Sequence, residues 1–173
     1  MPTIDADLLA RQALAPGTHG HAAVAERFGP GILRPDGSVD RPALGAIVFA
    51  DRTARTALEA IVHPEVRRRI GDWFANLPSG TRLAMTDIPL LFETGQEYDF
   101  DRVVVCACEP SEQLRRLVLR DGLSEEMARQ RLAAQWPIAE KVGRAHHVIR
   151  TDGTFADTRL QVDAVFQALT ALD

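Results

Sequence analysis

Two aspartates near the beginning of the chain, Asp5 and Asp7, are spaced two residues apart after a short apolar stretch. We predict that residues 3–7 form a strand running into a helix, and alternation along a strand would put both carboxylates on one side. The carboxyl ends of parallel strands are where open α/β sheets bind ligands. One carboxylate could therefore accept a proton from a substrate hydroxyl while the other orients that group or a metal. The alternative is that one of them caps the following helix.

A third carboxylate, Asp87, ends an apolar stretch at 83–88 that we read as a buried strand. Pro89 follows immediately and fixes the direction in which the chain leaves the strand. This position is typical of the strand-end aspartate that helps to hold magnesium in phosphoryl-transfer enzymes. Without that comparison, the segment reads as a strand that packs in the core and is followed by an exposed acidic residue.

Arginines gather in the second half of the chain, on two consecutive predicted helices. Arg116 and Arg120 are one helical turn apart, Arg115 is beside them, and Arg131 lies on the next helix. Guanidinium groups at this spacing can bind polyphosphate oxygens in bidentate fashion. The alternative is a solvated basic face whose charges are paired with neighbouring carboxylates, namely Glu112, Asp121 and Glu125.

The two cysteines, Cys106 and Cys108, are too few for a disulfide scaffold. Alternation on a strand would put both thiols on one face, and we interpret them as core residues. We expect no metal site of cysteine or histidine type, because no second ligand cluster lies at a suitable spacing.

The composition limits the class of protein. With 173 residues, 46% of them hydrophobic and 25% charged, the chain is long enough for one globular domain with a substantial core. The net charge of −4 argues against a nucleic-acid partner. No run of about 18 apolar residues and no signal peptide are visible, so we expect no membrane partner and a cytoplasmic location. The sequence does not predict an oligomeric state.

Predicted strands alternate with predicted helices, which indicates an α/β fold with a mainly parallel sheet. Further strands are expected at 102–107 and 146–150, and helices at 18–28, 43–49, 51–77, 110–120, from 124, and 155–172. Pro64 should kink or divide the long helix. The stretch 18–77 is too long for one crossover, so we predict a helical insert there and an α/β core formed by 1–17 and 78–173.

Seven motifs along the whole chain resemble, in order, those of the dephospho-coenzyme A kinase family. They are Ile4-Asp5-Ala6-Asp7-Leu8-Leu9-Ala10-Arg11, Phe28-Gly29 with Asp36-Gly37, Asp40-Arg41 with Leu44, Leu58-Glu59-Ala60-Ile61-Val62-His63-Pro64, Pro89-Leu90-Leu91-Phe92-Glu93, Gln113-Leu114-Arg115-Arg116 with Arg120-Asp121, and Arg131 with Ala134-Gln135 and Glu140-Lys141. The resemblance implies a P-loop kinase-like parallel sheet, a coenzyme A-binding helical insert at 18–77 and an Arg-rich lid at about 110–140.

The resemblance also implies a reaction and its participants. ATP, with Mg²⁺, would phosphorylate the ribose 3′-hydroxyl of dephospho-coenzyme A in the last step of coenzyme A synthesis. Asp7 matches the proposed general base of the family. Independently of the resemblance, the strand-end position of Asp87 suggests that it helps to hold the metal, directly or through water. The residues implied beside the acceptor are Asp5, Arg11, His63 and Glu93. Those implied in the lid and beside the nucleotide are Arg116, Arg120 and Arg131.

The sequence departs from the family pattern at one point. Family members have a strand and a G-x-x-x-x-G-K-[ST] loop before the Asp-x-Asp segment, and these 173 residues contain no such loop. We expect that first, central strand to be missing from the sheet, between the strands at 83–88 and 102–107. One hypothesis is a kinase whose recorded start is too late. The alternatives are a catalytically inactive protein that binds dephospho-coenzyme A and a chain that is not stably folded alone.

Overall fold

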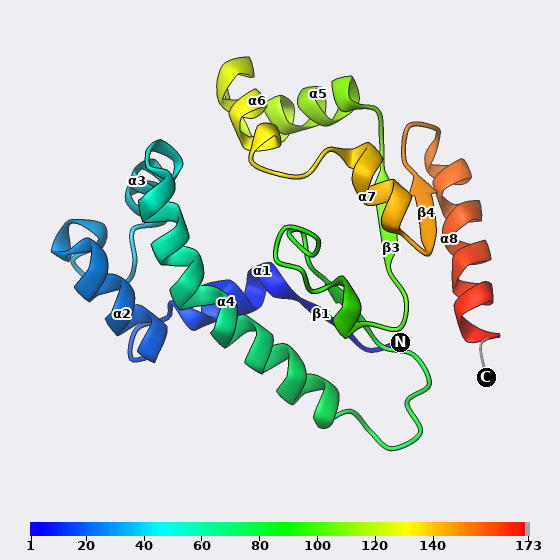
Figure 1. Ribbon diagram of the computed structural model, residues 1–173, viewed down its shortest axis with the longest axis horizontal. Helices are drawn as coiled ribbons and strands as arrows, with labels where there is room; N and C mark the ends of the chain where they lie inside the picture. The colour runs from blue at the N-terminus through cyan, green and yellow to red at the C-terminus, as the bar shows by residue number, and fades with distance from the viewer. Residues whose placement is uncertain (172–173) are drawn as a thin grey trace. The chain divides into compact units, whose positions relative to one another are not determined.

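The structure, a computed structural model, describes residues 1–171. It has two compact units, Met1–Pro89 and a second unit that begins at Leu90 (Figure 1). The sequence predicts a different division, into a helical insert at 18–77 and a core of 1–17 with 78–173. These two units do not test it, because it concerns the domains of the family fold, and it stays a prediction.

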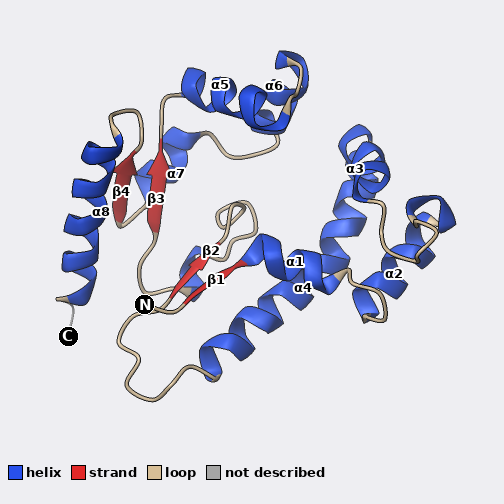
Figure 2. Cartoon of the chain, turned by 180° about the vertical axis from the view of Figure 1, so that it is seen from behind, coloured by secondary structure: helices blue, strands red, loops and turns tan. Residues whose placement is uncertain are grey.

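The first unit is mainly helical and contains a short parallel ladder (Figures 1 and 2). Its core is formed by the second, third and fourth helices and by the turn between the second and the third. Val24 and Ile32 are almost completely buried there. The elements are β1 (Thr3–Asp5), α1 (Ala6–Ala13), α2 (His19–Phe28), the 3₁₀ turn η1 (Pro30–Ile32), α3 (Arg41–Ala50), α4 (Arg52–Ala75) and β2 (Met85–Asp87).

Side-chain caps set the beginnings of these helices. Thr18 caps α2, Asp40 caps α3 and Asp51 caps α4, each by accepting a hydrogen bond from a backbone N–H in the first turn. Pro64 lies inside α4 and does not divide it, so that alternative was wrong. The cost of the missing N–H is offset by the packing of α4 against α1, α2 and α3.

A glycine allows α2 to approach α1 closely. Gly20 is buried in the first turn of α2, and a Cβ atom there would lie 2.4 Å from the carbonyl oxygen of Ala13. Any other residue would therefore push the end of α1 away from α2. This contact holds α1, which carries Asp7 and Arg11, against the helical core.

The second unit has two parallel strands with helices around them (Figure 2). Phe92, Val103, Val105 and Ala107 form its core, with Trp136 packed against them. Its elements are η2 (Glu97–Asp99), β3 (Val104–Ala107), α5 (Pro110–Asp121), α6 (Glu125–Ala133), α7 (Ile138–Arg144), β4 (His147–Arg150) and α8 (Phe155–Thr170).

Both ends of α5 follow from the sequence. Pro110 occupies the first turn, where its missing N–H is not needed. Gly122 ends the helix in the left-handed conformation with a φ of 63°, which favours glycine. Ser124 then caps α6 by accepting a hydrogen bond from the backbone N–H of Met127.

The described residues contain two ladders, each of two parallel strands. Asp5 of β1 is in register with Asp87 of β2, and Val105 of β3 is in register with Val148 of β4. Within residues 1–171, β2 pairs only with β1 and β3 pairs only with β4. A further strand between β2 and β3 stays a prediction.

One sequence prediction needs correction. The strand at 83–88 spans only Met85–Asp87 and is not buried, since the side chain of Met85 is 47% exposed. The closing helix α8 has no fully buried residue between 155 and 170, and its half-buried positions follow a helical spacing on one face, at Thr158, Gln161, Val165 and Leu169. Its predicted end at Leu172 lies outside the described residues. The residue pattern therefore identified β2 as a strand but overestimated its burial.

None of the helices between residues 1 and 171 combines the length and the apolarity that a membrane span requires.

Candidate active site

The turn from β1 into α1 separates the roles of the two N-terminal aspartates. The strand ends at Asp5 and the helix begins at Ala6, so Asp7 lies in the first helical turn. Strand alternation therefore does not relate the two carboxylates, because Asp7 lies outside the strand. Asp5 Oδ1 accepts hydrogen bonds from the backbone N–H groups of Asp7 (2.7 Å) and Leu8 (3.2 Å), which makes it the cap of α1.

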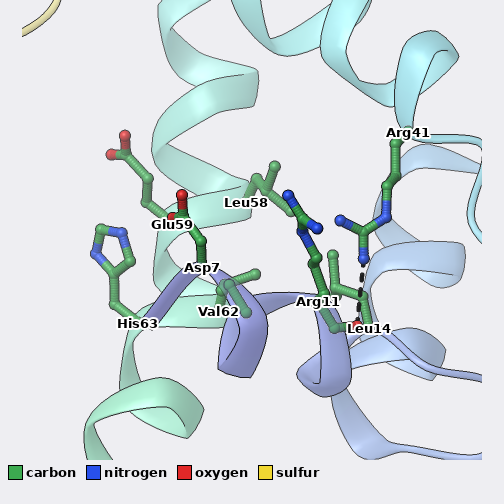
Figure 3. Close-up of a pocket in the computed structure, with 9 residues that line it drawn as sticks. Asp7, Arg11, Leu14, Arg41, Leu58, Glu59, Val62 and His63 are labelled. Atoms are coloured by element: carbon green, nitrogen blue, oxygen red, sulfur yellow. Dashed lines mark hydrogen bonds between the residues drawn. The ribbon is translucent and has the colours of Figure 1, made fainter. Parts of the chain in front are cut away.

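Asp7 lines a pocket of about 360 Å³ between α1, α3 and α4 (Figure 3). The pocket brings together three residues implied by the resemblance, Asp7, Arg11 and His63. Asp7 and Arg11 are one turn apart on α1, and His63 comes from the middle of α4. The other lining residues are Ala10, Leu14, Arg41, Leu58, Glu59 and Val62.

Two charged residues of this pocket, Arg41 and Glu59, had been given no role from the sequence. Arg41 is the first residue of α3, directly after its cap Asp40, and Glu59 lies one turn before His63 on α4. Both belong to motifs that carry the resemblance. The four-residue spacing from Glu59 to His63 was a usable signal, because it puts both on one helix face.

The polar groups of the pocket are arranged unevenly. Asp7, Glu59 and His63 lie toward one end, and Arg11 and Arg41 lie toward the other (Figure 3). The apolar side chains of Leu58 and Val62 line the wall that α4 contributes. Such an arrangement offers a proton acceptor at one end and positive charge at the other, which fits a ligand with a hydroxyl and an anionic group.

Asp87 lies beside Asp5 in the register of the β1–β2 ladder. Partial burial raises the pKa of Asp87, and the negative charges of Asp5 and Asp7 raise it further. A carboxylate whose charged form is disfavoured in this way gains from a nearby cation. Among residues 1–171 no group of three or more His, Cys, Asp and Glu side chains could hold a metal ion by itself.

Glu93 belongs to the second unit and forms an ion pair with Lys141. Its Oε1 lies 2.7 Å from Lys141 Nζ and also accepts a hydrogen bond from the backbone N–H of Trp136 at 2.8 Å. The two side chains are only 13% and 11% exposed. Glu93 thus joins the loop after residue 90 to α7, while its predicted contact with the acceptor stays a prediction.

The arginines of α5 and α6 are paired with carboxylates. Arg115 and Arg116 both bind Glu112, and Arg120 and Arg131 both bind Asp121. Arg116 also donates hydrogen bonds to the side chain (3.0 Å) and the backbone oxygen (2.6 Å) of Thr151. The alternative reading, a basic face paired with acidic neighbours, therefore describes these side chains, and their role toward a nucleotide stays a prediction.

The pKa values of the two carboxyl groups in this cluster follow the ion pairs. Hydrogen bonds from Arg115 and Arg116 lower the pKa of Glu112 from 4.5 to about 2. The hydrogen bond from Arg120, together with the charges of Arg120 and Arg131, lowers the pKa of Asp121. Both carboxyl groups therefore stay ionised well into the acidic range.

The cysteines differ from each other. Cys108 is buried, as predicted, but Cys106 is exposed, so the expectation that both thiols pack into the core was wrong for Cys106. The strand is buried at Val105 and Ala107, on the face opposite Cys106.

Comparisons with known proteins decide the family. The family model described as dephospho-CoA kinase matches residues 1–157. A dephospho-CoA kinase of Geobacillus kaustophilus is 45% identical, with all of this chain and 87% of the relative covered. One of Anaeromyxobacter dehalogenans is 50% identical, with 88% of this chain and 72% of the relative covered.

The chain belongs to the dephospho-CoA kinase family. Two solved structures agree with this. A dephospho-CoA kinase from Campylobacter jejuni has a TM-score of 0.71 at 30% identity, covering 98% of this chain and 85% of that one. A crystal structure from Thermus thermophilus has a TM-score of 0.78 at 36% identity, covering 97% and 84%. The predicted α/β fold and kinase family are confirmed, and the chain is a member of a family of transferases.

Proposed function

We propose that this chain provides the acceptor side of a reaction in which ATP phosphorylates the ribose 3′-hydroxyl of dephospho-CoA. The observation that supports it most directly is the pocket between α1, α3 and α4. That pocket joins Asp7, Arg11 and His63, which the family resemblance associates with the acceptor, and its charges fit a ligand with a hydroxyl and an anionic group.

Asp7 is the general base in this proposal. Its side chain is exposed and forms no ion pair within residues 1–171, so its carboxylate is available to a hydroxyl in the pocket. Taking the proton from the 3′-hydroxyl would make that oxygen a stronger nucleophile toward the γ-phosphate. Asp5 would act through its cap, which fixes the first turn of α1 and with it the position of Asp7.

The magnesium ion that accompanies ATP would be held on the protein side by Asp87. Magnesium in phosphotransferases is bound by one or two carboxylates together with substrate phosphates and water. The raised pKa of Asp87, produced by partial burial and by its acidic neighbours, fits a group that gains from a cation. When bound, the ion neutralises charge on the phosphates.

In the second unit, Arg116, Arg120 and Arg131 are proposed to bind the nucleotide. Each already has a protein partner, so a phosphate would add to Glu112 and Asp121 or replace them. A guanidinium has five N–H donors, and those not used by a carboxylate could bind phosphate oxygens.

The experiment is a transfer assay with the 173-residue chain, γ-labelled ATP, Mg²⁺ and dephospho-CoA, with calorimetry for each substrate. Label in the 3′-position of the product supports the proposal. Binding of dephospho-CoA without transfer would instead indicate the alternative function, an inactive dephospho-CoA-binding protein. No binding of dephospho-CoA at millimolar concentration would contradict both.

A further inference from the structure

Two arginines from different helices meet at one end of the pocket. Arg11 comes from the last turn of α1 and Arg41 from the first turn of α3, thirty residues later in the chain. The Arg41 side chain donates a hydrogen bond through Nη2 to the backbone oxygen of Arg11 at 3.3 Å (Figure 3). Arg41 is therefore held by the backbone of α1 while its remaining donors stay available to a ligand.

The two guanidinium groups are not neutralised by the protein. Within residues 1–171 neither Arg11 nor Arg41 forms an ion pair, and the nearest acidic lining residues, Asp7 and Glu59, lie toward the other end of the pocket. Burial lowers the pKa of Arg41, and the positive charges of Arg11 and Arg34 lower it further. Two like charges held together in this way are stabilised by an anion that binds both.

The acceptor has such an anion close to its reacting hydroxyl. In dephospho-CoA the ribose carries the 3′-hydroxyl and, through its 5′-carbon, the diphosphate that leads to the pantetheine arm. Asp7 and Arg11 are four residues apart on α1, a spacing that separates Cβ atoms by about 5–6 Å. A ribose placed with its 3′-hydroxyl at Asp7 would therefore have its 5′-diphosphate near Arg11.

We propose that Arg41, together with Arg11, binds the 5′-diphosphate of the acceptor and so sets which hydroxyl faces Asp7. This inference rests on the proposed function, and it adds Arg41 to the residues implied by the sequence. It makes Arg41 a specificity-determining residue that selects acceptors with an anionic group beside the ribose.

The experiment measures dephospho-CoA binding to the full chain by calorimetry at several KCl concentrations. The variants are Arg41→Gln, Arg41→Lys and, as the matched control, Arg52→Gln. Arg52 is an exposed arginine of the same unit that does not line the pocket, so its replacement removes the same charge elsewhere. Circular dichroism melting of each variant reports whether the fold is kept.

Arg41→Gln should weaken dephospho-CoA binding by about tenfold to hundredfold, the usual effect of losing a charge-assisted hydrogen-bonded contact. It should also reduce the dependence of the affinity on KCl, because one phosphate contact is lost. Arg41→Lys should fall between the wild-type chain and Arg41→Gln, and it carries the test if Arg41→Gln does not fold. Arg52→Gln should bind like the wild-type chain.

Unchanged affinity in Arg41→Gln would overturn the inference and leave the proposed function intact. Weaker binding with an unchanged KCl dependence would also overturn it, because Arg41 would then act only through its hydrogen bond to α1. In the remaining case the wild-type chain does not bind dephospho-CoA. The binding of inorganic pyrophosphate to the wild-type chain and to Arg41→Gln is then measured instead. Pyrophosphate binding that depends on Arg41 would support the anion site at Arg11 and Arg41 but contradict the proposed function. No pyrophosphate binding would contradict both the anion site and the proposed function.

Discussion

The pocket of the first unit and the α5–α6 cluster of the second unit hold charged side chains in opposite ways. In the first unit, Asp7, Arg11 and Arg41 line a pocket without ion pairs among residues 1–171. In the second unit, the arginines of α5 and α6 are already bound by Glu112 and Asp121. Unpaired charges in a pocket are prepared for a ligand, whereas paired ones hold local structure until a ligand competes for them.

This difference shows why charge alone is a weak guide to a site. The arginines of α5 and α6 form the more conspicuous cluster in the sequence, and their positions suggest phosphate binding at once. The structure shows that two carboxylates of α5 bind them, Glu112 in its first turn and Asp121 at its end. Arg41 stands alone in the sequence between Asp40 and Pro42, but the fold brings it to Arg11.

Asp7→Asn should sharpen the comparison most strongly. Removing the proposed general base should lower the turnover of the transfer reaction by about 10²–10⁴-fold, while dephospho-CoA binding stays within a small factor of the wild-type value. Turnover and calorimetric affinity, measured on the same preparation, check this. A variant with near-normal turnover would remove Asp7 from that role.

Lys141→Met tests the structural role of charges in the second unit. It leaves Glu93 buried without its cation, and breaking a buried ion pair from one side costs about 3–5 kcal/mol. Urea unfolding should therefore show a large loss of stability. Arg129→Met is the matched control, since it removes a pair with Glu125 whose side chains are 61% and 64% exposed and should cost less than about 1 kcal/mol.

Equal stability of these two variants would mean that the Glu93–Lys141 pair does not hold the second unit together. Glu93→Gln then separates stability from binding. If the variant loses dephospho-CoA affinity at temperatures where it is fully folded, Glu93 contacts the acceptor, as the resemblance implies. If only its melting temperature falls, Glu93 is a structural residue.

Asp87 of the first unit and Glu112 of the second unit should also differ in their titration. Glu112 has a folded pKa of about 2 against 4.5, so its ion pairs stabilise the fold fully above about pH 4.5 and this contribution is lost as the pH falls toward 2. The pKa of Asp87 is raised in the folded state, so the ionised form of this carboxyl group lowers the stability of the fold. This loss of stability grows as the pH rises through the raised pKa. Carbon NMR of the carboxyl groups should show Asp87 taking up its proton at a higher pH than Glu112, and the reverse order would contradict this account.

Local features of the sequence predicted much of the fold. The predicted helix beginnings at 18, 51 and 110 lie within one residue of those observed, whereas α3 begins at Arg41, two residues before the predicted 43. The undivided helix at Pro64 could not be predicted in this way, because tertiary packing of α4 offsets the missing hydrogen bond.

The pocket was predictable only in part. Asp7 and Arg11 lie on one helix, and their spacing alone puts them on one face. Arg41 and His63 reach the pocket from helices that begin thirty and more residues later, so their proximity depends on long-range packing of α1 against α4. The separation of Asp5 from Asp7 depended on the residue at which the strand ends, and such boundaries are the least certain part of a sequence reading.

Amide hydrogen exchange of the 173-residue chain, with and without saturating dephospho-CoA, tests most directly whether the acceptor binds in the first unit. The account predicts slower exchange in α1 and in α4 around residues 58–63, with α5 and α6 unchanged. In the same experiment ATP should affect α5 and α6. Slower exchange with dephospho-CoA confined to residues after Leu90, or none in α1 when calorimetry shows the ligand bound, would contradict the account.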